Sequence, residues 1–483
     1  MKNRFWWILF FSLLLLTVHA EDNDDDSNDS ATDSSSDATT DPSITETPSS
    51  VDSDSEPSTS MPSSSATDIP SPATPASPPA ISNVPGLAAN QTLNQQQLDQ
   101  LKISCSALQQ WYTTLGGPQW LDSTGWTNND MTSCCSWAKV YCNPVGGVIR
   151  ITLIGNNLAG SIPSTFQSFP HLVHLDMSYN NLTGGIPDSI AAGLAIQTLN
   201  FNFNQLSGLL PASLGSMPVL ASIHLANNTF NGTIPDSWAN LPLLKTLDLS
   251  NNKLSGPFPT SIANYRSLVS LSLSSNAFTG SLPHNIGIMP SLKSLVSKNQ
   301  LTGPIPESLG NITALVTISM RSQSLNGQIP SSLGNLPNLQ VLDLTRNNLT
   351  GSIPPQLGNL VHLRNLRLSR NALDGAVPAE LGLCGQLQIL TLNYNALSGT
   401  FPSIVAPPAL AFCHMQPNSF DACPPNDVSM NYSSMAFQCS VNCTSAKHKK
   451  SEGISVSSNS PFLLTVFMAI LALIVQEAIH VIL

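Results

Sequence analysis

A hydrophobic pattern that repeats about every 24 residues dominates the chain. It reads L-x-x-L-x-L-x-x-N-x-L-x-G-x-I-P, for example as LVHLDMSYNNLTGGIP at 172–187 and as LQVLDLTRNNLTGSIP at 339–354. Eleven copies are in register, 24 residues apart except for one step of 23, and a proline follows seven residues after each amide position. These amide positions are Asn156, Asn180, Asn204, Asn228, Asn252, Asn276, Asn299, Gln323, Asn347, Asn371 and Asn395.

The repeats predict a stacked fold, because one copy is too short to bury its own leucines. The L-x-L segments predict short strands that join side by side into a parallel sheet along a concave wall. The repeated asparagine is expected to hydrogen-bond backbone groups that the bend after each strand leaves unpaired. Glycine and proline then suit the turn that follows. The pattern therefore predicts an α/β solenoid.

The segment before the repeats predicts a cap. Apolar residues recur at helical spacing from Leu98 to Leu115, and Gly116-Gly117-Pro118 ends this predicted helix. A tryptophan- and cysteine-rich stretch follows, including CCSWAKVYC at 134–142. The first repeat of a solenoid would otherwise expose its core end-on. Zinc is not expected here, because cysteines of a secreted protein pair with one another.

The L-x-G-x-I-P tail and the CC-x-W...C motif resemble plant-type leucine-rich repeat proteins: receptor-like proteins, receptor-kinase ectodomains and polygalacturonase inhibitors. The resemblance covers roughly residues 94–443. It implies a right-handed superhelix with a parallel concave sheet, 3-10 and irregular turns on the convex side, and disulfide caps. It also implies the pairs Cys105–Cys134 and Cys135–Cys142. The subclass includes receptors, inhibitors and adhesion proteins, so the resemblance names no ligand.

Two neighbouring copies depart from the pattern. The seventh has one residue fewer between Leu295 and Asn299, so either Leu295 or Val296 must compromise in a strand whose side chains alternate. In the eighth, Gln323 replaces the asparagine. One interpretation is drift in a tolerant array. The other is that the two defects divide the concave wall into two surfaces.

Outward positions of the concave strands change character along the array. Arg346 and Arg370 hold the same position one copy apart, so their backbones should lie about 4.8 Å apart, while Asp343 stands beside Arg367 and is expected to neutralise it. Like charges so placed are destabilising unless they splay or bind an anion. An anion-preferring patch for acidic glycans or an acidic protein surface is one hypothesis, and solvated arginines are the other. The candidate ligand-binding residues are Arg321, Arg346, Arg367, Arg370, Tyr179 and Phe203.

The net charge of −11 belongs to a tail and not to the repeats. Residues 21–83 hold 14 acidic side chains and no Lys or Arg, whereas residues 143–402 hold 11 basic and 8 acidic ones, a net charge of +3. A nearly neutral array gives no indication of a nucleic-acid partner. The Asp/Ser/Thr/Pro-rich segment 21–88 lacks the apolar side chains of a core, so we expect a disordered, O-glycosylated stalk.

Both ends of the chain carry targeting patterns. Residues 1–20 read as a secretory signal peptide cut after Ala20, with a membrane anchor as the weaker alternative because the apolar run is short. A polar spacer at 446–460 precedes an apolar tail at 461–483, which indicates a GPI-anchor signal with attachment at Ser451 or Gly453. The alternative is a single-pass helix, against which the basic cluster 447–450 would lie outside the cell. Either way, the expected location is the extracellular side of the plasma membrane.

Nine N-x-S/T sequons predict a glycoprotein. Asn181, Asn227 and Asn348 flank the amide positions, so sugars there are expected beside the concave wall. Besides Asn28, the candidate sites are Asn90, Asn181, Asn227, Asn231, Asn311, Asn348, Asn431 and Asn442.

The array is expected to end in a second cap. LAFCHMQPNSF reads as a degenerate twelfth copy with Asn418 at the amide position. Cys413, Cys423, Cys439 and Cys443 then suggest a disulfide cap whose four cysteines allow three connectivities. Cys384 remains as a free, buried thiol on the convex side. The predicted domains are the N-terminal cap 89–145, the eleven repeats 146–402, and the degenerate repeat with the C-terminal cap 403–445.

The sequence predicts no enzyme. No G-x-S-x-G, H-E-x-x-H or phosphate-binding motif occurs, no cofactor or metal is implied, and no kinase domain follows the repeats. We expect a receptor-like, cell-surface protein without a signalling domain, which binds an extracellular protein or glycan on its concave face and needs a membrane co-receptor to signal. The alternatives are a structural or adhesion glycoprotein of the cell surface or wall, and an inhibitor of an extracellular hydrolase.

Overall fold

A computed structural model describes residues 93–399, 404–420, 431 and 433–439 of the chain. The predicted signal peptide, the predicted stalk and the tail from residue 440 onward lie outside these residues. Within them, no helix has both the length and the apolar character needed to cross a membrane.

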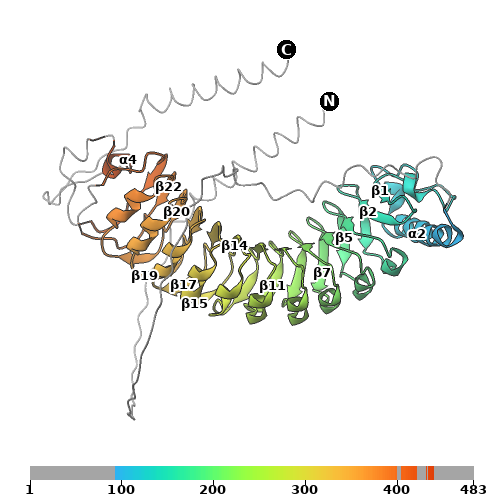
Figure 1. Ribbon diagram of the computed structural model, residues 1–483, viewed down its shortest axis with the longest axis horizontal. Coiled ribbons are helices and arrows are strands. Elements are labelled where there is room, and N and C mark those ends of the chain that lie inside the picture. Colours follow the sequence, from blue (N-terminus) through green and yellow to red (C-terminus); the bar gives the residue numbers. More distant parts are fainter. Residues whose placement is uncertain (1–92, 400–403, 421–430, 432, 440–483) are drawn as a thin grey trace, which may run out of the picture. The chain divides into compact units, whose positions relative to one another are not determined.

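A parallel sheet lines the inner side of the array (Figure 1), as the repeats predict. Thirteen described strands form it, and all pairs are parallel except β1 with β2. The leucines of successive strands are in register, as Leu175, Leu199 and Ile223 show, and each is buried. In order, the strands are β1 (Val140–Cys142), β2 (Val148–Thr152), β4 (His174–Asp176), β6 (Thr198–Asn200), β8 (Ser222–His224), β10 (Thr246–Asp248), β12 (Ser270–Ser272), β14 (Ser294–Val296), β16 (Thr317–Ser319), β18 (Val341–Asp343), β20 (Asn365–Arg367), β22 (Ile389–Thr391) and β23 (Phe412–His414).

The repeated asparagines form a hydrogen-bonded ladder along one edge of this sheet. The side-chain nitrogen of Asn252 donates to the carbonyls of Leu225 and Leu249 at 2.9 and 3.0 Å, and its oxygen accepts from the N–H of Phe230 at 3.0 Å. Each amide thus joins its own turn to the preceding one. The same donor pattern recurs at Asn180 and Asn347, so the prediction of an aligned amide ladder is confirmed.

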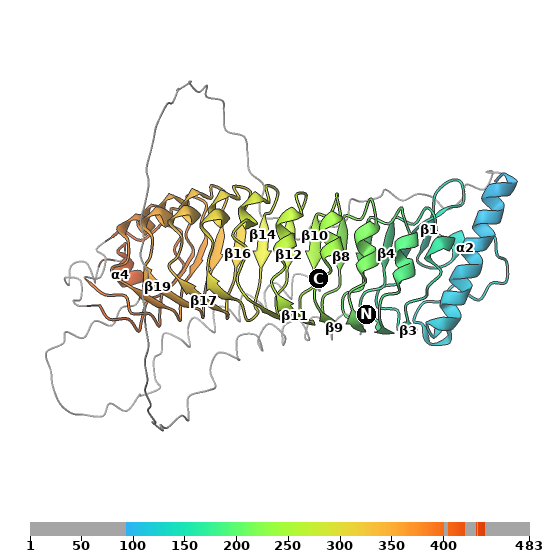
Figure 2. The ribbon, with the colours of Figure 1, turned by 90° about the horizontal axis from the view of Figure 1, so that it is seen from below.

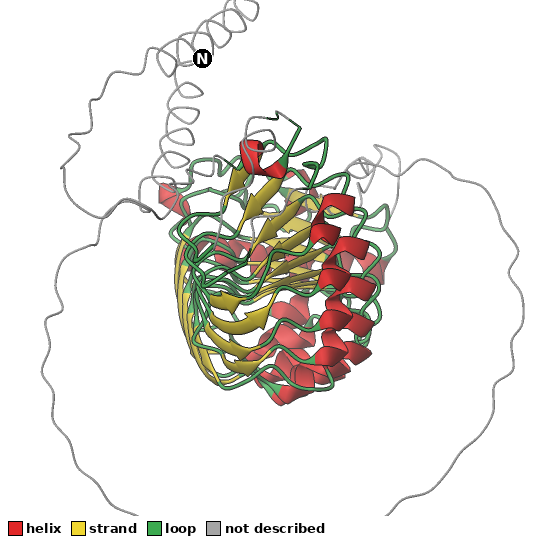
Figure 3. Cartoon of the chain, turned by 90° about the vertical axis from the view of Figure 1, so that its left-hand side faces the viewer, coloured by secondary structure: helices red, strands yellow, loops and turns green. Residues whose placement is uncertain are grey.

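Short 3-10 helices form the convex side, opposite the strands when the array is viewed end-on (Figure 3). Proline is the N-cap of most of them, for example Pro187 with φ −71° and Pro330 with φ −60°. The pyrrolidine ring fixes the φ that this entry needs. The helices are η3 (Phe166–Ser168), η4 (Asp188–Ala192), η5 (Ala212–Ser216), η6 (Asp236–Asn240), η7 (Thr260–Asn264), η8 (Ile286–Ile288), η9 (Glu307–Asn311), η10 (Ser331–Asn335), η11 (Pro355–Asn359) and η12 (Ala379–Leu383).

A second set of strands, which we call the lateral sheets, was not predicted. The L-x-G segment after each amide pairs with its neighbours in parallel, and its glycine has a positive φ, 75° at Gly184 and 88° at Gly256. The strands of the two lateral sheets are β3 (Ala159–Ser161), β5 (Asn181–Gly184), β7 (Gln205–Leu209), β9 (Thr229–Gly232), β11 (Lys253–Pro257) and β13 (Ala277–Thr279), followed by β15 (Thr302–Pro304), β17 (Ser324–Gly327), β19 (Asn348–Ser352) and β21 (Ala372–Asp374).

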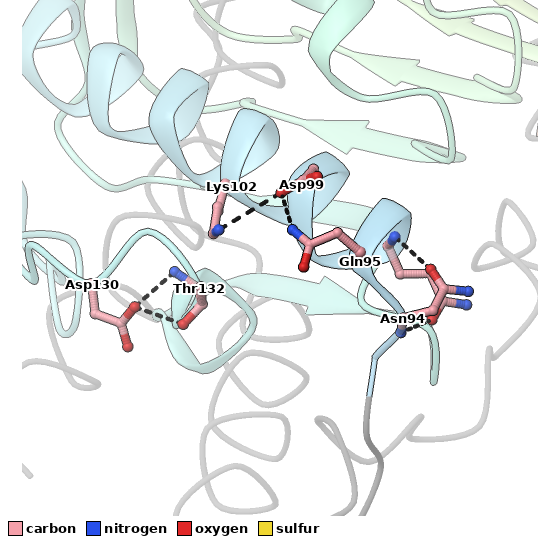
Figure 4. Close-up of polar contacts among 7 residues, drawn as sticks. Asn94, Gln95, Asp99, Lys102, Asp130 and Thr132 are labelled. Carbon is pink, nitrogen blue, oxygen red and sulfur yellow. Dashed lines mark hydrogen bonds and ion pairs between the residues drawn. The ribbon is translucent and has the colours of Figure 1, made fainter.

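The N-terminal cap closes the first turn, as predicted. Helix α2 (Gln95–Thr114) begins with a capping box between Asn94 and Gln97 (Figure 4). The buried Trp111 of this helix packs edge-on against Phe166 and Phe169 of the array, with ring centroids 5.5 and 5.0 Å away. Disulfides Cys105–Cys134 and Cys135–Cys142 are both present. The stacked turns then run from α2 at one end to the short α4 (Met435–Gln438) at the other (Figure 2).

The C-terminal cap contains a disulfide between Cys413 and Cys439, whereas Cys423 and Cys443 lie outside the described residues. Asn418 continues the amide ladder into the degenerate copy, since it accepts from the N–H of Leu397 at 3.0 Å. Cys384 is free and buried as predicted, and burial raises the pKa of its thiol to about 11. A thiol so protonated is a poor nucleophile.

The short seventh copy leaves the concave sheet intact. Leu295 stays buried, Val296 turns partly outward, and Ser297 takes the second buried position. Strands β12, β14 and β16 pair without interruption, so the hypothesis that these defects divide the concave wall is wrong. The missing residue precedes the lateral strand, and the lateral sheet is what ends there, between β13 and β15.

Replacing Gln323 by asparagine is expected to stabilise the array by about 1 kcal/mol. The side-chain nitrogen of Gln323 donates to the Ser297 carbonyl at 3.1 Å, but its buried oxygen has no hydrogen-bond partner in the described part of the chain. An asparagine oxygen would be placed to accept from the N–H of Leu301, as Asn276 accepts from Leu254. Urea denaturation measures the change, with exposed Gln300→Asn as the control. A midpoint that stays constant or falls in Gln323→Asn would contradict this account.

Candidate functional site

The residue before each ladder amide projects from the edge of the concave wall, and we call it the rim position. Its backbone is left-handed in most copies, with φ of 59° at Tyr179, 55° at Phe203, 58° at Arg346 and 56° at Arg370. Glycine and asparagine adopt this conformation most readily, whereas a bulky side chain costs about 1 kcal/mol or more. The aromatic and basic residues at the rim therefore do not serve the backbone, which makes them candidates for function.

Four exposed basic residues at or next to the rim position form what we call the cationic rim: Lys298, Arg321, Arg346 and Arg370. They come from copies seven to ten in succession. Backbone bonds keep the turns aligned there, since the N–H of Gln323 donates to the Arg346 carbonyl at 3.2 Å and that of Asn347 to the Arg370 carbonyl at 3.1 Å. Neighbouring turns of a parallel sheet lie about 4.8 Å apart, so the cations are closely spaced.

Positive charge dominates the concave side of copies seven to ten. Asp343 of β18 is the single carboxylate on this side among the described residues, whereas Glu307 and Asp374 lie in η9 and β21. Asp343 is buried and lies 4.0 Å from Arg367, as the sequence predicted for this pair. The basic residues in or beside these concave strands are Lys293, Lys298, Arg321, Arg346, Arg364, Arg367 and Arg370.

Tyr394 extends the cationic rim by one copy. The guanidinium carbon of Arg370 lies 4.5 Å from the centroid of its ring, a cation–π contact that orients the charge. Sequence reasoning missed both Tyr394 and Lys298. Their signal was the position before the amide, which Tyr394 holds 24 residues after Arg370 and Lys298 holds despite its shortened copy.

Tyr179 and Phe203 form a separate pair, which we call the aromatic rim. Their rings stack with centroids 4.3 Å apart at an interplanar angle of 11°. Both remain exposed, Tyr179 by 53% and Phe203 by 42%. They belong to copies two and three, so the structure separates the six predicted ligand-binding residues into an aromatic and a cationic group.

Polar residues between these groups bond to one another on the concave strands. The side-chain nitrogen of Asn200 donates to the Asp176 carboxylate at 2.9 Å, and that carboxylate also accepts from the hydroxyl of Ser178 at 2.7 Å. The described residues contain no group of three His, Cys, Asp or Glu side chains arranged to hold a metal ion.

Acidification is expected to destabilise the array through His174 and His224. Burial lowers the pKa of both imidazoles, although Asp176 beside His174 and Asp248 beside His224 oppose the shift. The unfolded chain then binds protons more readily, so stability is complete above about pH 6.5 and falls as the pH drops through the lower folded-state values. The melting temperature should fall from pH 7.5 to pH 5. This fall should shrink in the His174→Asn/His224→Asn variant but not in the exposed His284→Asn control, and equal falls would contradict the assignment.

Comparisons with known proteins agree with this architecture. A family model described as leucine rich repeat matches residues 195–254, 218–278 and 313–373, and another matches residues 171–192. No curated protein matches the chain. Similar solved structures include the LRR ectodomain of the plant membrane receptor kinase GASSHO1/SCHENGEN3 from Arabidopsis thaliana in complex with CASPARIAN STRIP INTEGRITY FACTOR 2. This match has 35% identity and a TM-score of 0.58, and covers 63% of this chain and 36% of that chain.

A plant ice-binding protein is also similar, with 27% identity, a TM-score of 0.51, and coverage of 60% of this chain and 90% of that chain. The chain thus spans about a third of the receptor ectodomain and most of the smaller protein. The repeats and these matches together support a plant-type leucine-rich repeat protein with an α/β solenoid fold. Such an ectodomain fold is typically a non-enzymatic scaffold for binding ligands.

Proposed function

We propose that this protein is an extracellular binding protein whose cationic rim recognises an acidic ligand, either a protein segment or a glycan. The observation that carries the proposal is the charge imbalance on the concave side of copies seven to ten. Seven basic residues lie in or beside these strands, and the carboxylate of Asp343, next to Arg367, is buried. The exposed cations of the rim have no comparable counter-charge on this face in the described residues.

Repulsion between neighbouring cations favours a ligand with several negative charges. Two unit charges about 4.8 Å apart repel by roughly 1 kcal/mol even in water. An anion that spans several turns would relieve this repulsion at each step. Because the cations are mounted on a continuous hydrogen-bonded sheet, little conformational entropy is lost when such a ligand binds.

The similar receptor-kinase ectodomain supports a ligand-binding, extracellular role, because its structure is a complex with CASPARIAN STRIP INTEGRITY FACTOR 2. In our proposal residues 1–20 direct secretion, residues 21–88 form a stalk, and the tail 461–483 directs attachment to the membrane. A membrane co-receptor would be the signalling partner. Release of the protein from intact cells by a phosphoinositide-specific phospholipase would support a GPI anchor, and retention would support a single-pass helix.

A panel of defined probes tests the proposed ligand class. Binding of the full chain is measured to an oligo-aspartate peptide, an oligogalacturonate, and neutral counterparts of equal length. We expect the acidic probes to bind, the neutral ones not to bind, and the affinity to fall with added salt because surface charges are screened. The tighter acidic probe distinguishes a protein from a glycan ligand. Equal binding of acidic and neutral probes, or binding of neither, would refute the proposal and favour an adhesion or inhibitor role.

A further inference from the structure

The structure separates the sequons into two kinds of place. Asn181 and Asn348 begin β5 and β19 of the lateral sheets, so sugars there would not lie on the concave wall as expected from the sequence. Asn231 of β9 is likewise lateral and exposed. Asn227 alone among the described sequons holds a rim position, with a left-handed φ of 57°. Asn311 ends η9, Asn431 is exposed in the C-terminal cap, and Asn28, Asn90 and Asn442 lie outside the described residues.

Asn227 is the rim neighbour of Phe203. The N–H of Phe203 donates to the Ala226 carbonyl at 2.9 Å, and the N–H of Asn204 donates to the Asn227 carbonyl at 3.2 Å, which puts the two rim residues in adjacent turns. Tyr179, from the turn on the other side, stacks on one face of the Phe203 ring. The opposite face of this ring therefore looks toward the turn of Asn227, and the ring is still 42% exposed.

The side-chain amide of Asn227 is available for modification. Its backbone is bonded to Ser250 in the next turn, at 2.9 Å, but no hydrogen bond to its side chain occurs within the described ranges. By contrast, the side-chain oxygen of Asn181 accepts a hydrogen bond from Gln205. A sugar on Asn227 would thus displace no side-chain contact and would begin next to an open aromatic face.

We infer that Asn227 carries an N-linked glycan whose first sugar packs on Phe203 and covers the aromatic rim. The inference rests on the proposed function, because the modification requires the secretory pathway. A bond forms between the side-chain nitrogen of Asn227 and the anomeric carbon of a lipid-linked oligosaccharide. The bond from that carbon to the lipid diphosphate breaks, and the amide loses one proton. The C–H face of the sugar then meets the negative face of the ring.

The glycan gives the two groups of rim residues different roles. Tyr179 and Phe203 become the platform for a sugar that belongs to the protein itself, and they are closed to other ligands. The cationic rim, in copies seven to ten, stays open. The glycan therefore confines an incoming ligand to the basic half of the wall.

Glycopeptide mass spectrometry of the full chain, secreted from eukaryotic cells, tests occupancy. We expect sugar on Asn227 as well as on the exposed Asn181, Asn231 and Asn348. A chain with the other three sites occupied and Asn227 bare would overturn the inference alone. A chain with all four sites bare would overturn the extracellular proposal, and the inference with it.

Hydroxyl-radical footprinting of the same chain tests the packing. Asn227→Gly removes the sugar and suits the left-handed backbone, while Asn231→Gln removes a sugar from the same copy on the lateral sheet. Oxidation of Tyr179 and Phe203 should rise about twofold in Asn227→Gly, since one ring face is uncovered, and should be unchanged in Asn231→Gln. Oxidation that does not rise in Asn227→Gly, or that rises equally in both variants, would overturn the inference.

Discussion

Replacing the ladder residue Asn204 by alanine is expected to destabilise the array by about 3–5 kcal/mol. Its side-chain nitrogen donates to the carbonyls of Met177 and Phe201 at 3.0 and 3.1 Å, and its oxygen accepts from the N–H of Leu182 at 3.0 Å. Alanine leaves these buried backbone groups of two turns without partners. Nearest-neighbour contacts carry the stability of a stacked array, so a lost rung weakens the junction between turns directly.

Urea denaturation followed by circular dichroism measures this loss. Asn326→Ala, at an exposed position of β17, is the matched control and should shift the midpoint little. A similar small shift for both variants would mean that the amide ladder does not hold the turns together.

Reversing two charges of the cationic rim, Arg346→Glu with Arg370→Glu, is expected to weaken binding of an acidic probe by about 100-fold, which is roughly 2.7 kcal/mol. Both side chains are exposed at left-handed rim positions, so the substitutions should leave the fold unchanged. The loss has two parts, because two attractive charges disappear and two repulsive ones replace them. Milder Arg346→Ser with Arg370→Ser should lose less affinity.

A control with the same change in net charge separates local from global electrostatics. Lys253→Glu with Arg266→Glu alters exposed residues in β11 and beside η7, away from the rim. This variant should retain most of the affinity. If the control loses as much affinity as the rim variant, the effect belongs to total charge and the rim is not the binding surface.

The concave sheet and the amide ladder could be predicted because each depends on contacts within one 24-residue period. Leu175 and Leu199 recur at the same step as Asn180 and Asn204, and stacking converts that sequence step into spatial register. The lateral sheets could not be predicted so easily. Their strands combine alternating burial with a glycine at positive φ, as at Gly184, and this glycine reads as a turn when the sequence is considered alone.

The candidate site was only partly predictable for the same reason. Spacing alone placed Arg346 beside Arg370 and Asp343 beside Arg367, and the structure confirms the second pair as an ion pair. Orientation around the solenoid is not contained in the spacing. Asn181 and Asn227 both adjoin ladder amides, yet one residue lies before the bend and the other after it, so they occupy different faces.

Carbodiimide cross-linking of the bound oligo-aspartate probe would locate the anion site most directly. This chemistry joins carboxylates to nearby amines, and Lys298 and Lys293 supply amines at the basic half of the wall, whereas exposed Lys253 lies on the lateral sheet. We predict probe adducts on Lys298 or Lys293 and none on Lys253. Adducts on Lys253 with both wall lysines unmodified would place the ligand elsewhere and contradict the account.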